Sequence, residues 1–203
     1  MTAVRASGAA PVVVIASHNQ GKIAEFMSLL APLPWVLTSA AALGLAEPEE
    51  TGITFAANAE IKARAIGTAS GQWALADDSG LEVAALAGAP GVYSARYAGA
   101  DRDFQRAMQR IETELAGQTD RRAQFVTVLA LYQTAQQITF FQGTVTGTLI
   151  WPPRGSGGFG YDPMFVPDGA TQTFAEMAAA EKGQRSHRGA ACAALRHHFG
   201  VET

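Results

Sequence analysis

Apolar and polar residues occur in blocks that predict alternating strands and helices. Residues 12–15 form a continuous run of apolar, largely β-branched side chains, which is typical of a strand buried on both faces. A polar turn follows, and the next apolar residues recur at the spacing of one helix face: Ile23, Phe26, Met27 and Leu30. Pro32 and Pro34 end this helix. The pattern therefore begins with a strand, a loop and a helix.

The next part of the chain repeats this pattern and then interrupts it with acids. Residues 35–38 suit a second strand, and residues 55–66 are rich in alanine at helical spacing, with Thr54 as the helix cap. Residues 73–76 predict another buried strand, which we expect to end where Asp77-Asp78-Ser79-Gly80 breaks the apolar pattern. Functional groups often lie at such strand ends.

The second half of the chain changes from a helical to an extended period. Apolar residues spaced along positions 104–115, after Asp101, predict an amphipathic helix with an acidic cap. Residues 124–132 and 138–150 are rich in Val, Thr, Phe and Leu and predict two paired antiparallel strands. A last helix is expected over about residues 186–199. Together these elements predict an α/β fold with a mixed sheet.

The bulk properties limit the domain organisation and the partners. We expect residues 1–11 to form a flexible N-terminal tail and residues 12–203 to form a single α/β domain. The formal net charge of -3 gives no general attraction to nucleic acid or to anionic lipid, so neither is expected as a partner. The apolar run at residues 12–16 is too short for a secretory core or a membrane span, which favours a cytoplasmic protein.

The rare residue types carry more information than the totals. Cys192 is the only cysteine, which excludes an internal disulfide and a cysteine-based zinc cluster, and we expect it to pack within the last helix. Lysine occurs only at positions 22, 62 and 182, and asparagine only at positions 19 and 58. A bias of the chain that replaces lysine by arginine and reduces asparagine explains most of this scarcity. Lysines that persist against such a bias are enriched at sites that need a compact ammonium group for a phosphate.

One polar loop lies between the first strand and the first helix, where its backbone N–H groups and the helix N-terminus can face an anion. It consists of Ser17, His18, Asn19, Gln20, Gly21 and Lys22. The loop is not a Walker A motif, because the upstream glycine is missing and Ile23 stands where that motif needs a hydroxyl residue. A phosphate loop is therefore one interpretation, and a capped turn with a surface lysine is the other.

A second glycine-rich segment, residues 155–160, matches the dinucleotide fingerprint G-x-G-x-x-G. Its context excludes a Rossmann site, because it follows prolines instead of a strand and leads into a Tyr-Asp-Pro sequence that begins no helix. The segment is either a flexible connector or a loop that approaches a ligand closely, with Phe159 or Tyr161 available to stack on a base.

Acidic side chains cluster at two places. Adjacent acids repel one another, so they are usually solvated or neutralised by a metal or a base. For residues 47–50, Glu-Pro-Glu-Glu, a solvated loop is the simpler interpretation. Asp77 and Asp78 follow an apolar strand, where burial without a counter-ion would be costly. Carboxylates of this kind suit Mg²⁺, which commonly binds one or two of them together with substrate phosphates.

Three donors lie close together near the start of the last helix: Lys182, His187 and Arg188. Singly, such residues are often surface caps. Together they could bind the acceptor edge of a base or an oxyanion. His197 and His198 show no metal-ligand spacing, and we expect both at the surface.

Six segments, spanning nearly the whole chain after residue 11, occur together in one family. They are residues 17–22 (SHNQGK), 49–59 (EETGITFAANA), 76–81 (ADDSGL), 88–97 (GAPGVYSARY), 157–163 (GGFGYDP) and 181–189 (EKGQRSHRG). In this order they resemble the inosine/xanthosine triphosphate pyrophosphatases of the Ham1 type, which clear deaminated purine nucleotides. The joint pattern is very specific, although no single segment is.

The resemblance implies an elongated mixed β-sheet flanked by helices, with two lobes and a central substrate cleft, in a homodimer. It also implies a reaction. The triphosphates of inosine, deoxyinosine and xanthosine (ITP, dITP, XTP) would be hydrolysed, with Mg²⁺ as cofactor, by attack of water at the α-phosphorus. The products would be the nucleoside monophosphate and pyrophosphate.

The same resemblance implies roles for individual residues. The loop of residues 17–22 would hold the triphosphate, with Lys62 as a second cation, and Ser79 would touch the substrate. Glu49 and Asp78 would serve the Mg²⁺, and Asp78 would also accept the proton. The sequence does not decide whether Glu49 or Glu50 faces the metal. The base would be enclosed by Phe159, Gly160, Tyr161, Asp162, Lys182, His187 and Arg188.

Two alternative functions stay open at this point. The Maf-type pyrophosphatases have a similar sheet and act on other nucleotides, but their first loop is Ser-rich and carries arginine instead of Asn-x-Gly-Lys. A non-catalytic nucleotide sensor would keep the lysines and the base pocket but could dispense with the acids, which this chain has.

Overall fold

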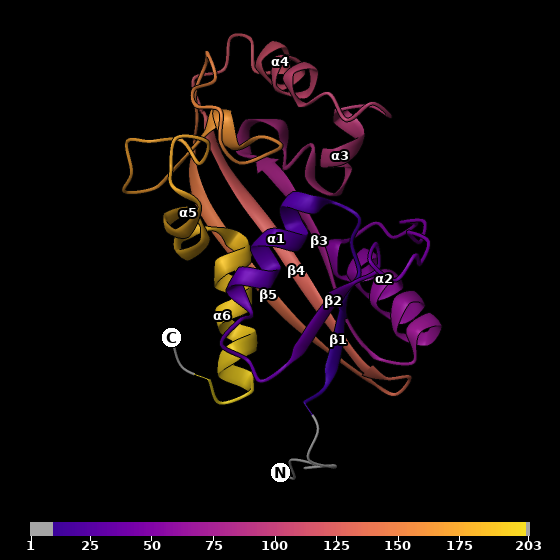
Figure 1. The fold of residues 1–203 in the computed structure, drawn as a ribbon. Helices are drawn as coiled ribbons and strands as arrows, with labels where there is room; N and C mark the ends of the chain where they lie inside the picture. The colour runs from indigo at the N-terminus through magenta and orange to yellow at the C-terminus, as the bar shows by residue number, and fades with distance from the viewer. Residues whose placement is uncertain (1–9, 202–203) are drawn as a thin grey trace.

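A long mixed sheet forms the centre of the computed structural model, which describes residues 10–201 (Figure 1). Its six strands follow one another in the order β2-β1-β3-β4-β5-β6. They are β1 (Val12–Ile15), β2 (Val36–Ser39), β3 (Trp73–Val83), β4 (Arg122–Thr134), β5 (Gln137–Leu149) and β6 (Phe165–Pro167). β1 pairs in parallel with β2 and β3, whereas the pairs from β3 to β6 are antiparallel.

Helices cover both faces of this sheet (Figure 1). α1 (Gln20–Leu29) and α6 (His187–His198) pack on one face, and α2 (Phe55–Ser70) packs on the other. α5 (Ala179–Arg185) precedes α6, whereas α3 (Ser94–Tyr97) and α4 (Phe104–Glu114) lie near the far end of β3. Short 3₁₀ turns occupy Ala84–Leu86, Gly91–Tyr93 and Asp162–Met164.

Polar side chains begin the helices where the sequence predicts them. Thr54 caps α2 by accepting a hydrogen bond from the backbone N–H of Ala57. Ser186 caps α6 as expected, whereas the acidic cap of α4 is Asp103 and not the predicted Asp101, because the helix begins only at Phe104. Each cap satisfies a backbone donor that has no partner inside its helix.

The prediction that the third strand ends at the acids was wrong. β3 continues to Val83, because β4 pairs with it from Ala74 to Val83 and bonds the backbone groups along one of its edges. Its other neighbour, β1, pairs only as far as Leu75. Beyond that point the opposite edge of β3 is no longer covered by a strand, so Asp77 and Asp78 lie where one neighbouring strand stops.

Two apolar clusters packed against the same face of β3 correspond to the two lobes of the molecule. Leu75 belongs to an apolar cluster with α1 and α6, and Leu81 belongs to a second cluster with α4 and β6. Asp77 and Ser79 lie between them on the same face, because side chains two residues apart in a strand point the same way. Polar residues thus separate the two apolar clusters and form the floor of a cleft between the lobes.

The structure also tests smaller predictions about Cys192, the histidines of the last helix and the N-terminal tail. Cys192 is fully buried in α6, and His197 and His198 are exposed, as predicted. The predicted tail lies outside the described residues except for Ala10 and Pro11, and the carbonyl group of Pro11 accepts a hydrogen bond from Val36. The single domain over residues 12–203 stays a prediction. None of the helices within residues 10–201 is both long and apolar enough to cross a membrane.

Candidate active site

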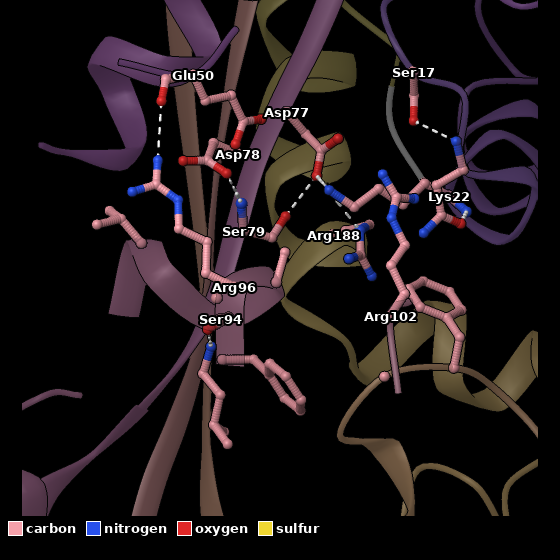
Figure 2. A pocket seen from close by; sticks show the side chains of 18 of the residues that line it. Ser17, Lys22, Glu50, Asp77, Asp78, Ser79, Ser94, Arg96, Arg102 and Arg188 are labelled. Carbon is pink, nitrogen blue, oxygen red and sulfur yellow. Dashed lines mark hydrogen bonds and ion pairs between the residues drawn. The ribbon is translucent and has the colours of Figure 1, made fainter. Parts of the chain in front are cut away.

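A cleft of about 630 Å³ lies between the two lobes, and both lobes contribute to its wall. Figure 2 shows the phosphate loop, the acids of β3 and Arg188 converging on it from different parts of the chain. The predicted site residues that line the cleft are Ser17, Asn19, Lys22, Glu49, Lys62, Asp78, Ser79, Phe159, Gly160, Tyr161, Asp162, His187 and Arg188.

The loop of residues 17–22 is fastened by its own side chains. Ser17 Oγ accepts a hydrogen bond from the backbone N–H of Asn19 at 3.1 Å. Asn19 Oδ1 accepts one from the backbone N–H of Lys22, also at 3.1 Å, and so caps α1. These bonds set the path of the loop and direct the Lys22 side chain towards β3, where its ammonium group meets Asp77.

Asp77 is the buried anion on the α1 and α6 face of β3. Its Oδ2 atom lies 2.8 Å from Lys22 Nζ and 3.8 Å from Arg188 Nε, and Ser79 Oγ donates to it at 2.5 Å. Burial alone would raise the pKa of Asp77, but the Lys22, Arg188 and Lys62 cations together hold that pKa well below its usual value. Asp77 is therefore a permanent negative charge among cations from three helices, α1, α2 and α6.

Asp78 points to the opposite face of the strand, towards α2. Asn58 donates to its Oδ2 atom at 3.0 Å, and the backbone N–H of Ser79 donates to its Oδ1 atom at 3.0 Å. Burial and the nearby Glu50 carboxylate raise the pKa of Asp78 to about 6, although Lys62 and Asn58 oppose this shift. The two neighbouring aspartates thus have opposite environments and opposite pKa shifts.

The carboxylates of Glu50 and Asp78 lie beside one another and fit a hard divalent cation (Figure 2). Lys62, which is itself buried, pairs with Glu50, and it lies close enough to Asp78 to lower its pKa. Within residues 10–201, no group of three or more His, Cys, Asp and Glu side chains is arranged to hold a metal ion. Two carboxylates with open coordination positions suit Mg²⁺, which keeps water and substrate oxygens in its shell.

Cations surround the half-buried ring of Phe159 on the other side of the cleft. Lys182 Nζ lies 4.5 Å from the centre of that ring, and the guanidinium carbon of Arg188 lies 5.0 Å from it. Lys182 also bonds Asp162 Oδ2 at 2.6 Å and Glu25 at 2.7 Å, and Arg188 bonds Glu25 at 2.9 Å. The acids fix both cations in place beside an aromatic face.

His187 presents a neutral ring to the same region. It stacks on Phe125, with the two ring centres 4.9 Å apart and the planes tilted by 12°. Neither ring nitrogen has a hydrogen-bond partner within the described residues, although both are buried. Burial, followed by the nearby Arg188 and Lys182 charges, lowers the pKa of His187 well below its usual value. A neutral imidazole has one donor and one acceptor, so this ring can bind a polar ligand edge.

Comparison with known proteins identifies the family of this chain. The model of the Ham1 family matches residues 13–198. The chain belongs to the Ham1 family. The family resemblance seen in the sequence is thereby confirmed.

Relatives of this Ham1 family member have closely similar sequences. A protein of Gluconobacter oxydans, called dITP/XTP pyrophosphatase, is 53% identical over 183 residues, which cover 90% of this chain and 88% of the relative. A protein of Zymomonas mobilis with the same name is 54% identical over 179 residues, covering 87% and 86% of the two chains.

Solved Ham1 structures have the same fold. The Ham1 protein of Coxiella burnetii is 39% identical and superposes with a TM-score of 0.86, covering 94% of this chain and 98% of that protein. The Ham1 protein of Staphylococcus aureus gives a TM-score of 0.83 at 39% identity, covering 93% and 98%. The expected α/β fold with a long mixed sheet is confirmed.

Most of the residues expected from the family pattern meet at the cleft, with a few exceptions. Lys182 lies behind the wall, where it bonds Asp162, and Gly21 lies against Phe159. His18 and Gln20 are not among the lining residues. Glu49 lines the cleft but is exposed, whereas Glu50 contacts Lys62 and lies near Asp78. The geometry of this Ham1 family chain therefore favours Glu50 over Glu49 as the partner of Asp78.

Glu25 is the functional candidate that the sequence analysis missed. It lies on α1, three residues after Lys22, and binds two cations that follow it by more than 150 residues along the chain. A single acid on an amphipathic helix carries no local signal of such a role. Only the packing of α6 against both α1 and α5 brings the three side chains together, because Lys182 lies on α5 and Arg188 on α6.

Proposed function

We propose that this Ham1 family protein hydrolyses ITP, dITP and XTP to the nucleoside monophosphate and pyrophosphate, and so removes deaminated purines from the nucleotide pool. The observation that carries the proposal is the meeting of three sets of residues at one cleft. These are the phosphate loop with Lys22, the carboxylates of Glu50 and Asp78, and the cationic aromatic pocket around Phe159. The names of the relatives at 53% and 54% identity support the same reaction.

In the proposed complex the triphosphate lies along the loop of residues 17–22. Backbone N–H groups at the start of α1 face the phosphates, because the first turn of a helix leaves such donors without partners. Lys22 and Lys62 supply positive charge, and they approach from opposite faces of β3. Positioning and charge neutralisation are the main needs of phosphoryl transfer, which explains why cations dominate this part of the cleft.

Glu50 and Asp78 would hold Mg²⁺, which supplies neutralisation of the negative charge on the departing pyrophosphate. Asp78 takes the proton of the attacking water. The oxygen of that water forms a bond to the α-phosphorus, and the bond from the α-phosphorus to the bridging oxygen breaks with its electron pair leaving on pyrophosphate. Asn58 and the backbone N–H of Ser79 keep the Asp78 carboxylate oriented for this role.

The pocket around Phe159 would distinguish purines by hydrogen-bond polarity. The base would stack on the Phe159 ring, with donors of Arg188 and His187 facing its 6-oxo group. An adenine base would place a 6-amino donor against these donors and leave buried polar groups unpaired. A penalty of that kind supports discrimination of up to about 10⁴-fold.

A substrate panel with product identification tests the reaction. We expect Mg²⁺-dependent release of pyrophosphate, not orthophosphate, from ITP, dITP and XTP, with ATP turned over far more slowly. In water labelled with ¹⁸O, the label should enter the nucleoside monophosphate, because attack at the β-phosphorus would label pyrophosphate instead. Asp78→Asn should bind ITP and lose turnover. Equal rates with ITP and ATP would contradict the proposal.

The remaining alternatives make different predictions in the same panel. A sensor would bind ITP tightly without turnover in Mg²⁺, and a Maf-like enzyme would prefer other nucleotides to ITP and XTP. The homodimer is proposed from the family resemblance, and the cytoplasmic location from the short apolar run at residues 12–16. Analytical ultracentrifugation of the purified protein measures the first, and fractionation of the producing cell measures the second.

A further inference from the structure

The acid segment, defined here as residues 46–51, has few internal supports. It has no regular secondary structure, and within the described residues its backbone takes part in no backbone–backbone hydrogen bond. After its end, the N–H of Gly52 donates to Asn58 Oδ1 at 2.7 Å. Within the segment, the carbonyl oxygen of Glu50 accepts a hydrogen bond from Arg96 Nη2 at 3.0 Å. Arg96 therefore fixes the backbone of the residue whose carboxylate lies beside Asp78.

Arg96 belongs to the opposite lobe, on a short segment that is firmly attached to β3. Its guanidinium group lies over the ring of Tyr93, 4.9 Å from the ring centre. Ser94 Oγ accepts from the N–H of Leu81 at 2.9 Å and donates to the carbonyl of Gly91 at 2.7 Å. A side chain at Gly80 would collide with Gly91, so the two backbones are in close contact.

The attachment point is close in sequence to the reacting groups. Leu81 follows Asp78 by three residues along β3, so the segment that carries Arg96 is fixed to the same strand as Asp78. The bond from Arg96 to Glu50, a dashed line in Figure 2, then connects the acid segment to the segment that is attached to that strand.

We propose that Arg96 is a positioning residue that holds Glu50 beside Asp78, so that the two carboxylates bind a divalent cation together. The inference rests on the metal site of the proposed function. The positioning role and the positive charge of Arg96 predict opposite changes in metal affinity when this side chain is removed. A nearby cation disfavours the binding of another cation, so removal of the charge alone would strengthen metal binding. Loss of the hydrogen bond to Glu50 would weaken it.

Arg102 provides a matched comparison. It lies in the same lobe, and its guanidinium group is 3.8 Å from the Glu47 carboxylate in the same acid segment. Arg102 and Arg96 are both exposed, but Arg102 contacts an exposed side chain, whereas Arg96 contacts the backbone of Glu50. Exposed pairs of this kind contribute little to structure. Arg102→Ala therefore removes a similar charge without removing the support of Glu50.

The experiment measures binding of Mn²⁺, a spectroscopic substitute for Mg²⁺, to nucleotide-free protein by electron paramagnetic resonance. We expect Arg96→Ala to weaken Mn²⁺ binding about tenfold, which is typical for loss of a group that orients a metal ligand. Arg96→Lys keeps the charge and one donor, so its affinity should lie between those of wild type and Arg96→Ala. Arg102→Ala should stay within about twofold of wild type.

Turnover gives an independent readout of the same idea. In Arg96→Ala, the Mg²⁺ concentration for half-maximal rate should rise by a similar factor, while kcat at saturating Mg²⁺ should stay within about threefold of wild type. If Arg96 instead bound the substrate, KM for ITP at saturating Mg²⁺ would rise and Mn²⁺ binding would not change. That pattern would overturn the proposal, as would unchanged or tighter Mn²⁺ binding by both Arg96 variants.

Glu50→Gln separates failure of this inference from failure of the metal site. If Glu50→Gln weakens Mn²⁺ binding and the Arg96 variants do not, Arg96 has no positioning role and the proposed function stands. If Glu50→Gln and Asp78→Asn both leave Mn²⁺ binding unchanged, the metal site itself is wrong. Thermal unfolding and circular dichroism establish that each variant is folded, and Arg96→Lys supplies the test if Arg96→Ala is not.

Discussion

Lys22 of the phosphate loop and Asp77 of β3 form an ion pair at 2.8 Å, with the Asp77 side chain almost completely removed from solvent. Lys22 would bind a phosphate of the proposed substrate, so Asp77 carries the negative charge that balances this lysine when no substrate is present. Arg188, from the far end of the chain, approaches the same carboxylate. One acid thus connects the phosphate loop with the proposed base pocket.

The first prediction concerns Asp77→Asn. The substitution leaves Lys22 and Arg188 without their shared anion, and breaking a buried pair in this way costs about 3 kcal/mol or more. We therefore expect the free energy of unfolding, measured with urea, to fall by about that amount. Saturating pyrophosphate should stabilise the variant more than it stabilises wild type, because the added anion replaces the lost carboxylate.

Asp120→Asn is the control for this measurement. Asp120 also pairs with an arginine, Arg122, at 2.7 Å, but that pair is exposed. Its loss should change the free energy of unfolding by less than about 1 kcal/mol. Equal effects of the two substitutions, or no extra stabilisation of Asp77→Asn by pyrophosphate, would show that Asp77 does not act as the internal counter-ion of the site.

Local sequence patterns predicted much of this structure because they depend on local physics. The run at residues 12–15 reads as a buried strand by its composition alone, and Thr54 and Ser186 are helix caps whose partners lie three residues away. The rare lysines and asparagines were also informative. Residues 22, 62, 182, 19 and 58 all take part in contacts in or directly behind the cleft.

The rest depends on long-range pairing that no local pattern contains. The length of β3 follows from its pairing with β4, so the polar residues from Asp77 to Gly80 did not end the strand. The opposite shifts in the pKa of Asp77 and of Asp78 depend on which helix covers each face. Glu50 is favoured over Glu49 as the metal ligand because Glu50 pairs with Lys62. No local pattern shows that this lysine of α2 reaches the acid segment.

A second prediction concerns Cys192. Burial raises the pKa of its thiol to about 12, so the reactive thiolate is scarce at neutral pH. Ellman's reagent should label less than about a tenth of this thiol in the folded protein over an hour, and the whole of it in denaturant. Rapid labelling of native protein would mean that α6 opens readily, which would contradict its packing against the sheet.

A third prediction tests the contact between the two halves of the site. A methyl group added at Gly21 would lie 2.8 Å from Phe159 Cδ1, which forces the aromatic ring to move. Gly21→Ala should therefore lower kcat/KM for ITP by about tenfold, a cost of about 1.4 kcal/mol that is usual for overpacking. Inhibition by inorganic tripolyphosphate, which has no base to stack, should change much less.

Gly183→Ala provides the matched comparison for Gly21→Ala. Gly183 lies in α5, and a methyl group there would meet Leu29 at an ordinary 3.6 Å. We expect kcat/KM for ITP to stay within about twofold of wild type in this variant. If Gly21→Ala changed ITP hydrolysis and tripolyphosphate inhibition equally, the added methyl group would act on the phosphate loop itself and not through Phe159.

The last prediction concerns the pH dependence of stability that His187 causes. Its pKa in the folded protein is well below 6.5, because burial and then the neighbouring Arg188, Lys182 and Lys22 cations disfavour a charged ring, although Asp77 opposes them. In the unfolded chain the ring binds a proton below about pH 6.5. The unfolded state therefore binds more protons in that range, and the free energy of unfolding falls as the pH falls.

The size of the effect follows from that difference. Between pH 7 and about pH 5.5 His187 should remove about 1 kcal/mol of stability from the wild type. His187→Gln cannot take up this proton, so urea denaturation should show a pH dependence that is smaller by that amount, since the other groups titrate in both proteins. His197→Gln on the exposed side of α6 should behave as wild type. A wild-type pH dependence in His187→Gln would mean that the His187 ring binds a proton in the folded protein as readily as in the unfolded chain, so it would not stay a neutral partner for the base below about pH 6.5.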